Sequence, residues 1–255
     1  MKTKMNRWMM LSFIVGSAFM FSSCTQDTLS PQKTTYGSLI QVASDGTTTV
    51  STSNLLAAFT STASLSDAEV AMLLKMKEEE KLAHDVYVTM YEKWPKPIFL
   101  NISNAEERHL QAIITLLKFY NQEDTLVAAR GIFSTPELTQ LYQTLVAKGD
   151  SSLANAYQVG LQIEEMEIQD LTVALATDPN TNIVITFENL LKASRNHLRV
   201  FYLQLSALDI VYIPQYITQE EYDTTVLSPM EQGSQFALQN QYQYNYQYRH
   251  ENNGH

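Results

Sequence analysis

Four segments of the sequence have the periodicity of amphipathic helices, and each carries an acid or a histidine on its apolar face. In the first segment, Glu80 of the stretch EEEKLAHDVY shares a face with Leu73 and Tyr87. In the second, Glu106 and His109 are three residues apart, which places them side by side on a helix. Carboxylates and imidazoles on inner faces are the ligands that pairs of iron or manganese ions take in helical proteins.

The third and fourth segments repeat this pattern. Glu164 and Glu167 lie on the face that also carries Leu171. In the fourth segment, Ser194 and His197 are surrounded by apolar residues. The predicted metal ligands are therefore Glu80, Glu106, His109, Glu164, Glu167 and His197.

Other polar residues of these segments have supporting or surface positions. Tyr87 and Ser194 are placed to hydrogen-bond the ligands and to fix their orientation. His84 and Asp85 fall outside the apolar face of the first segment. We expect these two residues on the helix surface.

The energetic cost of burying acids favours a metal site. An isolated ionised carboxylate in an apolar core costs several kcal/mol, and several carboxylates together also repel one another. The arginines of the four segments lie beside the polar faces rather than on the apolar stripes: Arg108, Arg195 and Arg199. Metal cations between the helices would supply the missing positive charge, as a di-iron (Fe) or manganese (Mn) site does.

Simpler explanations of single residues stay open. A lone buried glutamate or histidine is more often satisfied by a tyrosine or a backbone group than by a metal ion. Glu106 also stands three residues after Ser103, as the second member of a capping box does. Neither explanation accounts for such residues on all four apolar faces. Glu164 and His197 are also at similar distances along the chain from the turn between their helices, so they lie at one height.

Four long helices are needed to bring these residues together. The first begins at Ser66 as N-cap, with Glu69 completing a capping box, and ends near Trp94. The second, third and fourth are expected over residues 103–120, 153–177 and 183–208.

The segment between the second and third helices is long enough to make those two helices parallel. It contains its own short helix over residues 136–147, with Pro136 in the first turn. The predicted fold class is all-α: a four-helix bundle with a long crossover that carries a short extra helix.

Composition narrows the class of protein. The 255 residues are 45% hydrophobic, which is enough for a substantial core. The net charge of -10 provides no basic surface, so nucleic acid is excluded as a partner. No nucleophile elbow or zinc-hydrolase motif is present, which argues against a hydrolase.

The ends of the chain differ in composition from the helical part. Residues 1–23 predict a lipoprotein signal peptide, with Cys24 as the lipidated residue. The lipid would anchor the protein in the cell envelope, at the outer membrane. A transmembrane anchor is the weaker alternative, because the apolar run is shorter than the roughly 20 residues that span a bilayer. Residues 24–65 predict a Ser/Thr-rich tether, 66–226 the bundle with a C-terminal extension, and 227–255 a low-complexity Gln/Tyr/Asn-rich tail.

Several stretches resemble the ferritin-like proteins, and more closely the bacterial family called domain of unknown function 2202. They include EEEKLAHDVY, NISNAEERHL, YQVGLQIEEMEIQDL and SRNHLRVFY, within residues 65–224. The resemblance implies a ligand role for Glu80 in the first helix. It also assigns the Glu-x-x-His pair of the second helix to Glu106 and His109, and the glutamate of the third to Glu164.

The fourth helix departs from the ferritin-like pattern. Ser194 stands where the glutamate of a second Glu-x-x-His motif is expected, before His197. Either Glu167 replaces that carboxylate from the third helix, or only one metal ion binds tightly. The departure bears on chemistry with dioxygen rather than on the fold.

The resemblance implies a protein that binds iron, or a nonhaem di-iron oxidoreductase acting on iron, peroxide or oxygen, and the N-terminal segment predicts that it is extracytoplasmic. The alternative is a metal-free helical adaptor that keeps the bundle only as a scaffold. The expected partners are metal ions and, through the N-terminal lipid, a membrane. A homodimer stays open, and no residue identifies an electron donor.

Overall fold

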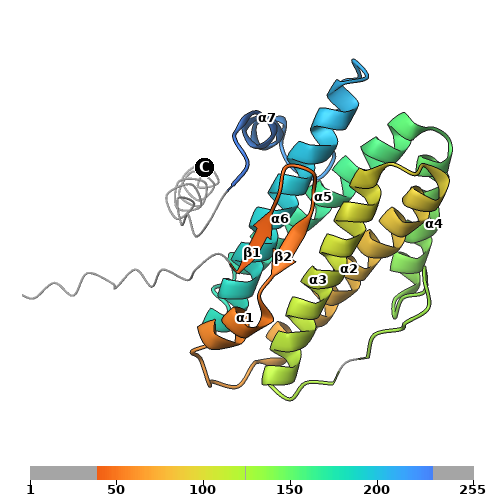
Figure 1. Ribbon diagram of the computed structural model, residues 1–255. Coiled ribbons are helices and arrows are strands. Elements are labelled where there is room, and N and C mark those ends of the chain that lie inside the picture. The colour runs from red at the N-terminus through yellow and green to blue at the C-terminus, as the bar shows by residue number, and fades with distance from the viewer. Residues whose placement is uncertain (1–38, 124, 232–255) are drawn as a thin grey trace, which may run out of the picture. The chain divides into compact units, whose positions relative to one another are not determined.

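The computed structural model describes residues 39–123 and 125–231, which fold into a largely helical unit (Figure 1). The predicted all-α class is confirmed, with a small hairpin added to it. The elements in chain order are β1 (Ile40–Val42), β2 (Thr48–Val50), α1 (Thr52–Ala58), α2 (Asp67–Lys93), α3 (Pro97–Phe119), α4 (Pro136–Asp150), α5 (Leu153–Leu175), α6 (Thr181–Ser206) and α7 (Gln219–Leu227). No helix in these two ranges combines the length and the apolar character that crossing a bilayer requires.

The four long helices α2, α3, α5 and α6 contact one another in a closed ring. Helix α2 packs on α3, α3 on α6, α6 on α5, and α5 on α2. At one end of the ring, Tyr120 Oη donates to Asn180 Oδ1 at 3.0 Å, and Asn180 N donates to Glu69 Oε1 at 2.7 Å. The starts of α2 and α6 and the end of α3 therefore meet at that end, so α3 and α5 run in the same direction.

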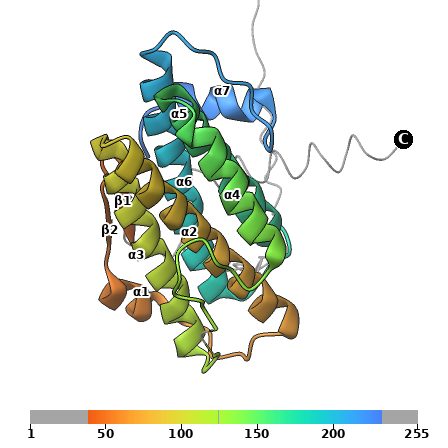
Figure 2. The same cartoon turned by 90° about the vertical axis from the view of Figure 1, so that its right-hand side faces the viewer.

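Helix α4 belongs to the crossover that returns the chain from the end of α3 to the start of α5. It lies outside the ring against α2 and α5, as Figure 2 shows. At the far end, Trp94 Nε1 donates to Gly149 O at 3.0 Å, which ties the end of α4 to the end of α2. The crossover thus spans the length of the ring.

Local signals at the helix starts explain their boundaries. The capping box at Ser66 is present as predicted, since its side chain accepts from Glu69 N and the Glu69 side chain accepts from Ser66 N. The predicted start of the second helix at Ser103 is wrong, because α3 already begins at Pro97. Proline suits the first helical turn, where its missing N–H costs no hydrogen bond.

Residues 39–58, which the sequence assigns to a tether, form the hairpin β1–β2 and helix α1 instead. The strands pair antiparallel, with Val42 opposite Thr48. Ile40, Val42 and Thr48 are buried. The alternation of apolar residues explains this order, and threonine is itself a good strand former. The signal peptide, Cys24, the rest of the tether to residue 38 and tail residues 232–255 lie outside the described residues.

The crossover is held against α2 by buried charged side chains. Glu78 accepts from Ser134 N at 3.0 Å and from Ser134 Oγ at 2.6 Å. Lys81 Nζ donates to Asp85 Oδ2 at 2.5 Å, and Gly131 N donates to the same oxygen at 2.9 Å. The expectation that Asp85 lies on the surface is therefore wrong, because the crossover covers it.

Glu165 has a comparable role at the C-terminal side of the ring. Its carboxylate is buried and accepts from Gln215 N at 2.7 Å, from Tyr216 N at 2.9 Å and from Tyr212 Oη. These bonds fix the loop between α6 and α7. The side chain therefore points away from the interior that receives Glu164.

Candidate metal centre

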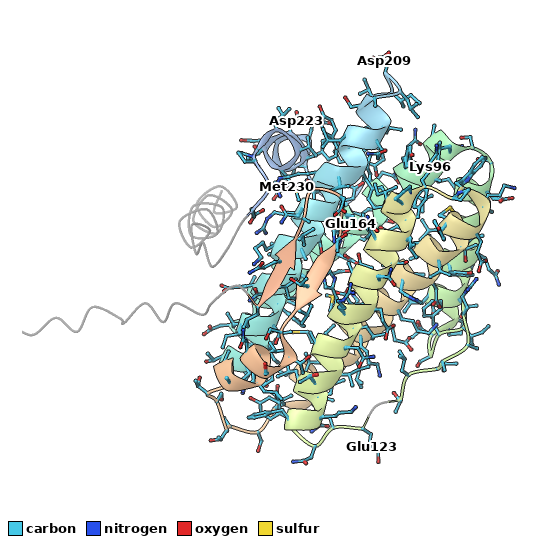
Figure 3. All side chains as sticks on the ribbon, viewed as in Figure 1. Lys96, Glu123, Glu164, Asp209, Asp223 and Met230 are labelled. Carbon is cyan, nitrogen blue, oxygen red and sulfur yellow. The ribbon has the colours of Figure 1, made fainter. Side chains whose placement is uncertain are left out.

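The six predicted ligands come together inside the ring of long helices. Each of their side chains is at most 2% exposed, and Glu164 is labelled among the helices in Figure 3. Helix α2 contributes Glu80, α3 contributes Glu106 and His109, α5 contributes Glu164 and Glu167, and α6 contributes His197. All four inner faces thus supply polar groups to one buried cluster.

Five of these residues form two groups that share Glu106. The first group is Glu80, Glu106 and His109, and the second is Glu106, Glu164 and His197; within each, ligand atoms lie within 4.8 Å of one another. Glu106 Oε2 lies 2.7 Å from His109 Nδ1, and Glu106 Oε1 lies 3.0 Å from His197 Nδ1. Each oxygen of one carboxylate therefore faces a different imidazole, as expected of a carboxylate that bridges two cations.

The remaining two carboxylates of these groups flank the imidazoles. Glu80 Oε2 lies 3.3 Å from His109 Nδ1, and Glu164 Oε2 lies 3.5 Å from His197 Nδ1. The two rings are stacked with centroids 5.5 Å apart. Both histidines thus present Nδ1, rather than Nε2, to the carboxylates.

Unpaired polar atoms are concentrated in this cluster. Within the described ranges, all but one of the buried side-chain atoms without a hydrogen-bond partner belong to it, the exception being Glu79 Oε2. They are both oxygens of Glu80, Glu106 Oε1, Glu164 Oε2, Glu167 Oε1, His109 Nε2 and His197 Nδ1. Buried polar atoms in native proteins are almost always paired, so a local excess of unpaired ones indicates a binding site.

Tyr87 and Ser194 each donate a hydrogen bond to one of the predicted ligands. Tyr87 Oη donates to Glu164 Oε1 at 2.7 Å, and Ser194 Oγ donates to Glu167 Oε2 at 3.0 Å. In both glutamates the other oxygen has no hydrogen-bond partner among the described residues. Each hydroxyl therefore fixes one oxygen of a carboxylate and leaves the second turned toward the cluster.

Thr48 is a contact of the cluster that the sequence does not reveal. Its Oγ1 lies 3.3 Å from His197 Nε2, and its side chain is fully buried. The residue lies in strand β2, within the segment assigned to a tether. Only its strand-like alternation with the exposed Thr47 and Thr49 could have indicated an inward-facing side chain.

Burial and mutual contact shift the pKa values of the cluster. Burial raises the pKa of Glu80 to about 8 and holds that of Glu167 well above its usual range. Burial opposes protonation of the histidines, but Glu106 outweighs it and raises the pKa of His109 to about 10 and that of His197 to about 9. Protons therefore balance the buried charge of the ion-free protein, and metal binding would displace them.

A relative of this chain has been solved. Uncharacterized protein MJ0754 of Methanocaldococcus jannaschii is 43% identical over 170 residues, which cover 66% of this chain and 92% of the relative. The crystal structure of hypothetical protein MJ0754 from Methanococcus jannaschii has a TM-score of 0.66 at 41% identity, and the match covers 68% of this chain and 100% of that chain.

These matches contradict the predicted cell-envelope location. The archaeal relative is covered over almost its full length, so the part it shares with this chain makes up nearly all of that protein. The relatives therefore link this part to no lipid anchor or outer membrane. The predicted cell-envelope location is therefore corrected, because the matched relative does not support it.

A family model also matches the helical part of the chain. It is described as an uncharacterized protein domain, DUF2202, and it matches residues 69–229. The matched range runs from the first turn of α2 to the end of α7 and includes all six residues of the buried cluster, whereas the hairpin and Thr48 precede it. This match covers more than half of the chain, which therefore belongs to the DUF2202 family.

Proposed function

We propose that this chain binds a pair of transition-metal ions in the buried cluster, with iron as the first candidate and manganese as the second. The observation that carries the proposal is the position of Glu106, whose two oxygens face two different imidazoles in two overlapping ligand groups. Carboxylate oxygens and imidazole nitrogens are suitable donors for both metals.

Charge balance favours two ions over one. The cluster contains four carboxylates, on Glu80, Glu106, Glu164 and Glu167, and two imidazoles that are neutral when they bind metal. Two divalent cations would bring the net charge of the ionised cluster to zero, whereas with a single ion two of the carboxylates must keep their protons or remain buried as uncompensated charges. A buried uncompensated charge is strongly unfavourable.

The arrangement of the helices supports a ferritin-like assignment for the fold. Two antiparallel pairs, α2 with α3 and α5 with α6, joined by a long crossover, are typical of ferritin-like bundles. Such bundles place a Glu-x-x-His motif on an inner face, as Glu106 and His109 are placed here.

We further propose iron binding or the oxidoreduction of iron, peroxide or oxygen as the activity of the site. Bound iron supplies the ability to exchange electrons with such substrates. The surrounding residues exclude water, since the six ligands are at most 2% exposed. Tyr87 and Ser194 each donate a hydroxyl hydrogen bond to one carboxylate oxygen and so hold the ligands in position.

Elemental analysis tests the metal proposal directly. Wild-type protein purified without a metal-affinity tag is expected to contain about two iron or manganese ions per chain. Loading with metal at 100 times its dissociation constant is expected to stabilise the fold by about 2.7 kcal/mol for each ion bound, which thermal unfolding with and without a chelator measures. A folded wild type that binds neither ion in a titration would support the metal-free adaptor instead.

Glu167→Gln tests whether α5 supplies the carboxylate that is missing from α6. We expect the bound metal to fall from about two ions to about one per chain, because the variant keeps the shape of the side chain but removes its charge. Asp170→Asn is the matched control on the same helix, where the acid pairs with Lys75 outside the cluster. Two ions bound with wild-type affinity in Glu167→Gln would mean that Glu167 is not a ligand.

A further inference from the structure

We infer that Thr48 is a positioning residue of the metal centre, which accepts the hydrogen bond of His197 Nε2 and thereby keeps Nδ1 turned toward Glu106 and Glu164. This inference rests on the proposed function. It assigns a part of the centre to strand β2, which precedes the residues that the family model matches.

The two nitrogens of His197 lie in different surroundings. Nε2 lies 3.3 Å from Thr48 Oγ1. On the other side of the ring, Nδ1 lies 3.0 Å from Glu106 Oε1 and 3.5 Å from Glu164 Oε2. A contact at Nε2 therefore determines where Nδ1 points, because the two atoms belong to one rigid ring.

The protonation of a metal-bound imidazole makes this contact important. When Nδ1 binds a metal ion, the remaining ring proton is on Nε2, and that N–H needs an acceptor in a buried site. Thr48 is fully buried, and its hydroxyl oxygen is the hydrogen-bond partner of Nε2. A threonine hydroxyl accepts such a hydrogen bond, whereas the methyl group of a valine does not.

The second histidine has no corresponding partner. His109 Nε2 is buried and makes no hydrogen bond within the described ranges. The two halves of the centre thus differ in how their imidazoles are held. We expect Thr48 to influence the half formed by Glu106, Glu164 and His197 more than the half formed by Glu80, Glu106 and His109.

The hairpin is fastened so that Thr48 keeps its position. Strand β2 packs on α3 and β1 packs on α6, so the hairpin spans the two helices that carry the histidines. Asn101 Nδ2 donates to Asp45 O at 2.9 Å and ties the hairpin turn to α3. The turn residue Gly46 has a φ of +83°, and a Cβ there would lie 2.7 Å from Ile102 Cγ1. Only glycine fits this close contact without strain.

Thr48→Val tests the inference, with cobalt(II) as a spectroscopic probe of the two sites. In the variant we expect the affinity of one of the two cobalt ions to fall roughly 10- to 100-fold and its visible absorption bands to shift. Thr48→Ser keeps the hydroxyl and is expected to restore the wild-type affinity and spectrum. Thr49→Val, on the exposed neighbour in the same strand, is the matched control.

The outcomes separate this inference from the proposed function. Wild-type affinity and spectrum in Thr48→Val would overturn the positioning role while leaving the metal centre intact. Equal losses in Thr48→Ser and Thr48→Val would also overturn it, because the hydroxyl would then not matter. A wild type that binds no cobalt, iron or manganese would instead overturn the proposed function.

NMR of the ion-free protein gives a further readout, since the Nε2–H signal of His197 should be protected from exchange in wild type and Thr48→Ser but not in Thr48→Val.

Discussion

Glu106→Gln is expected to abolish binding of both metal ions. Changing a residue that only supports a ligand lowers metal affinity by up to about 100-fold, so we expect a larger loss for this shared ligand. Glu106 is the residue common to both ligand groups. The variant keeps the volume of the side chain but removes the charge that faces His109 and His197 at 2.7 and 3.0 Å. Metal content after purification and titration with iron(II) or cobalt(II) measure the effect.

Variants of the unshared glutamates sharpen this test. Glu80 belongs only to the first group and Glu164 only to the second. Glu80→Gln and Glu164→Gln are therefore each expected to lose about one ion per chain. The difference between losing one ion and losing two identifies the shared ligand. Equal losses in all three variants would contradict the bridging position of Glu106.

The control for Glu106→Gln is the next residue in the chain. Glu107 is only half-buried, and its Oε1 accepts a hydrogen bond from Gln111 Nε2 at 3.0 Å on the outer side of α3. Glu107→Gln is expected to leave the metal content and the affinity unchanged. Retention of both ions by Glu106→Gln would remove the observation on which the proposed function depends.

The buried cluster could be predicted from the sequence because charged residues on an apolar stripe are costly. Glu106 and His109 are neighbours on one helix turn, so their proximity follows from spacing alone. The contact between Ser194 and Glu167 joins two helices, and the sequence predicts only that Ser194 hydrogen-bonds a ligand and that Glu167 is one candidate for the missing carboxylate. Local periodicity and the cost of buried charge therefore identify the residues of the cluster before any tertiary contact is known.

Contacts between distant segments could not be predicted in this way. Thr48 and His197 are separated by 149 positions in the chain, and the Ser/Thr-rich composition around Thr48 suggested a tether. The buried position of Asp85 escapes prediction for a related reason. Helix α2 is covered on two sides, by the ring of long helices and by the crossover, so the polar side of its periodic pattern is also buried. A single amphipathic stripe does not describe such a helix.

The second large effect is expected for Asp85→Ala, which should destabilise the fold by about 3–5 kcal/mol. The change leaves Lys81 buried with its positive charge uncompensated, since the side chain of Lys81 is only 5% exposed. Its remaining contacts are Ala129 O at 3.0 Å, Ile132 O at 3.3 Å and the ring of Phe133 at 4.4 Å. Denaturant unfolding of the ion-free protein measures the loss.

Two comparisons assign this loss to the buried pair. Adding Lys81→Met to Asp85→Ala is expected to recover part of the stability, because the buried cation is removed with its partner. Asp150→Ala breaks the exposed pair with Lys93, and its cost is expected to stay below about 1 kcal/mol. If Asp85→Ala cost no more than Asp150→Ala, the Lys81–Asp85 pair would not be what holds the crossover on α2.

The pH dependence of stability gives an independent check on Asp85. Burial acts to raise its pKa, but hydrogen bonds from His84, Lys81 and Gly131 N outweigh burial and lower it below the ordinary value of 3.8. A carboxyl group whose pKa is lower in the folded state stabilises the fold above its unfolded-state pKa, and this stabilisation is lost as the pH falls through the folded-state value. Wild type should therefore lose more stability than Asp85→Ala below about pH 4. Metal stoichiometry should be the same in both proteins, because the pair holds the crossover outside the ring and contributes no atom to either ligand group.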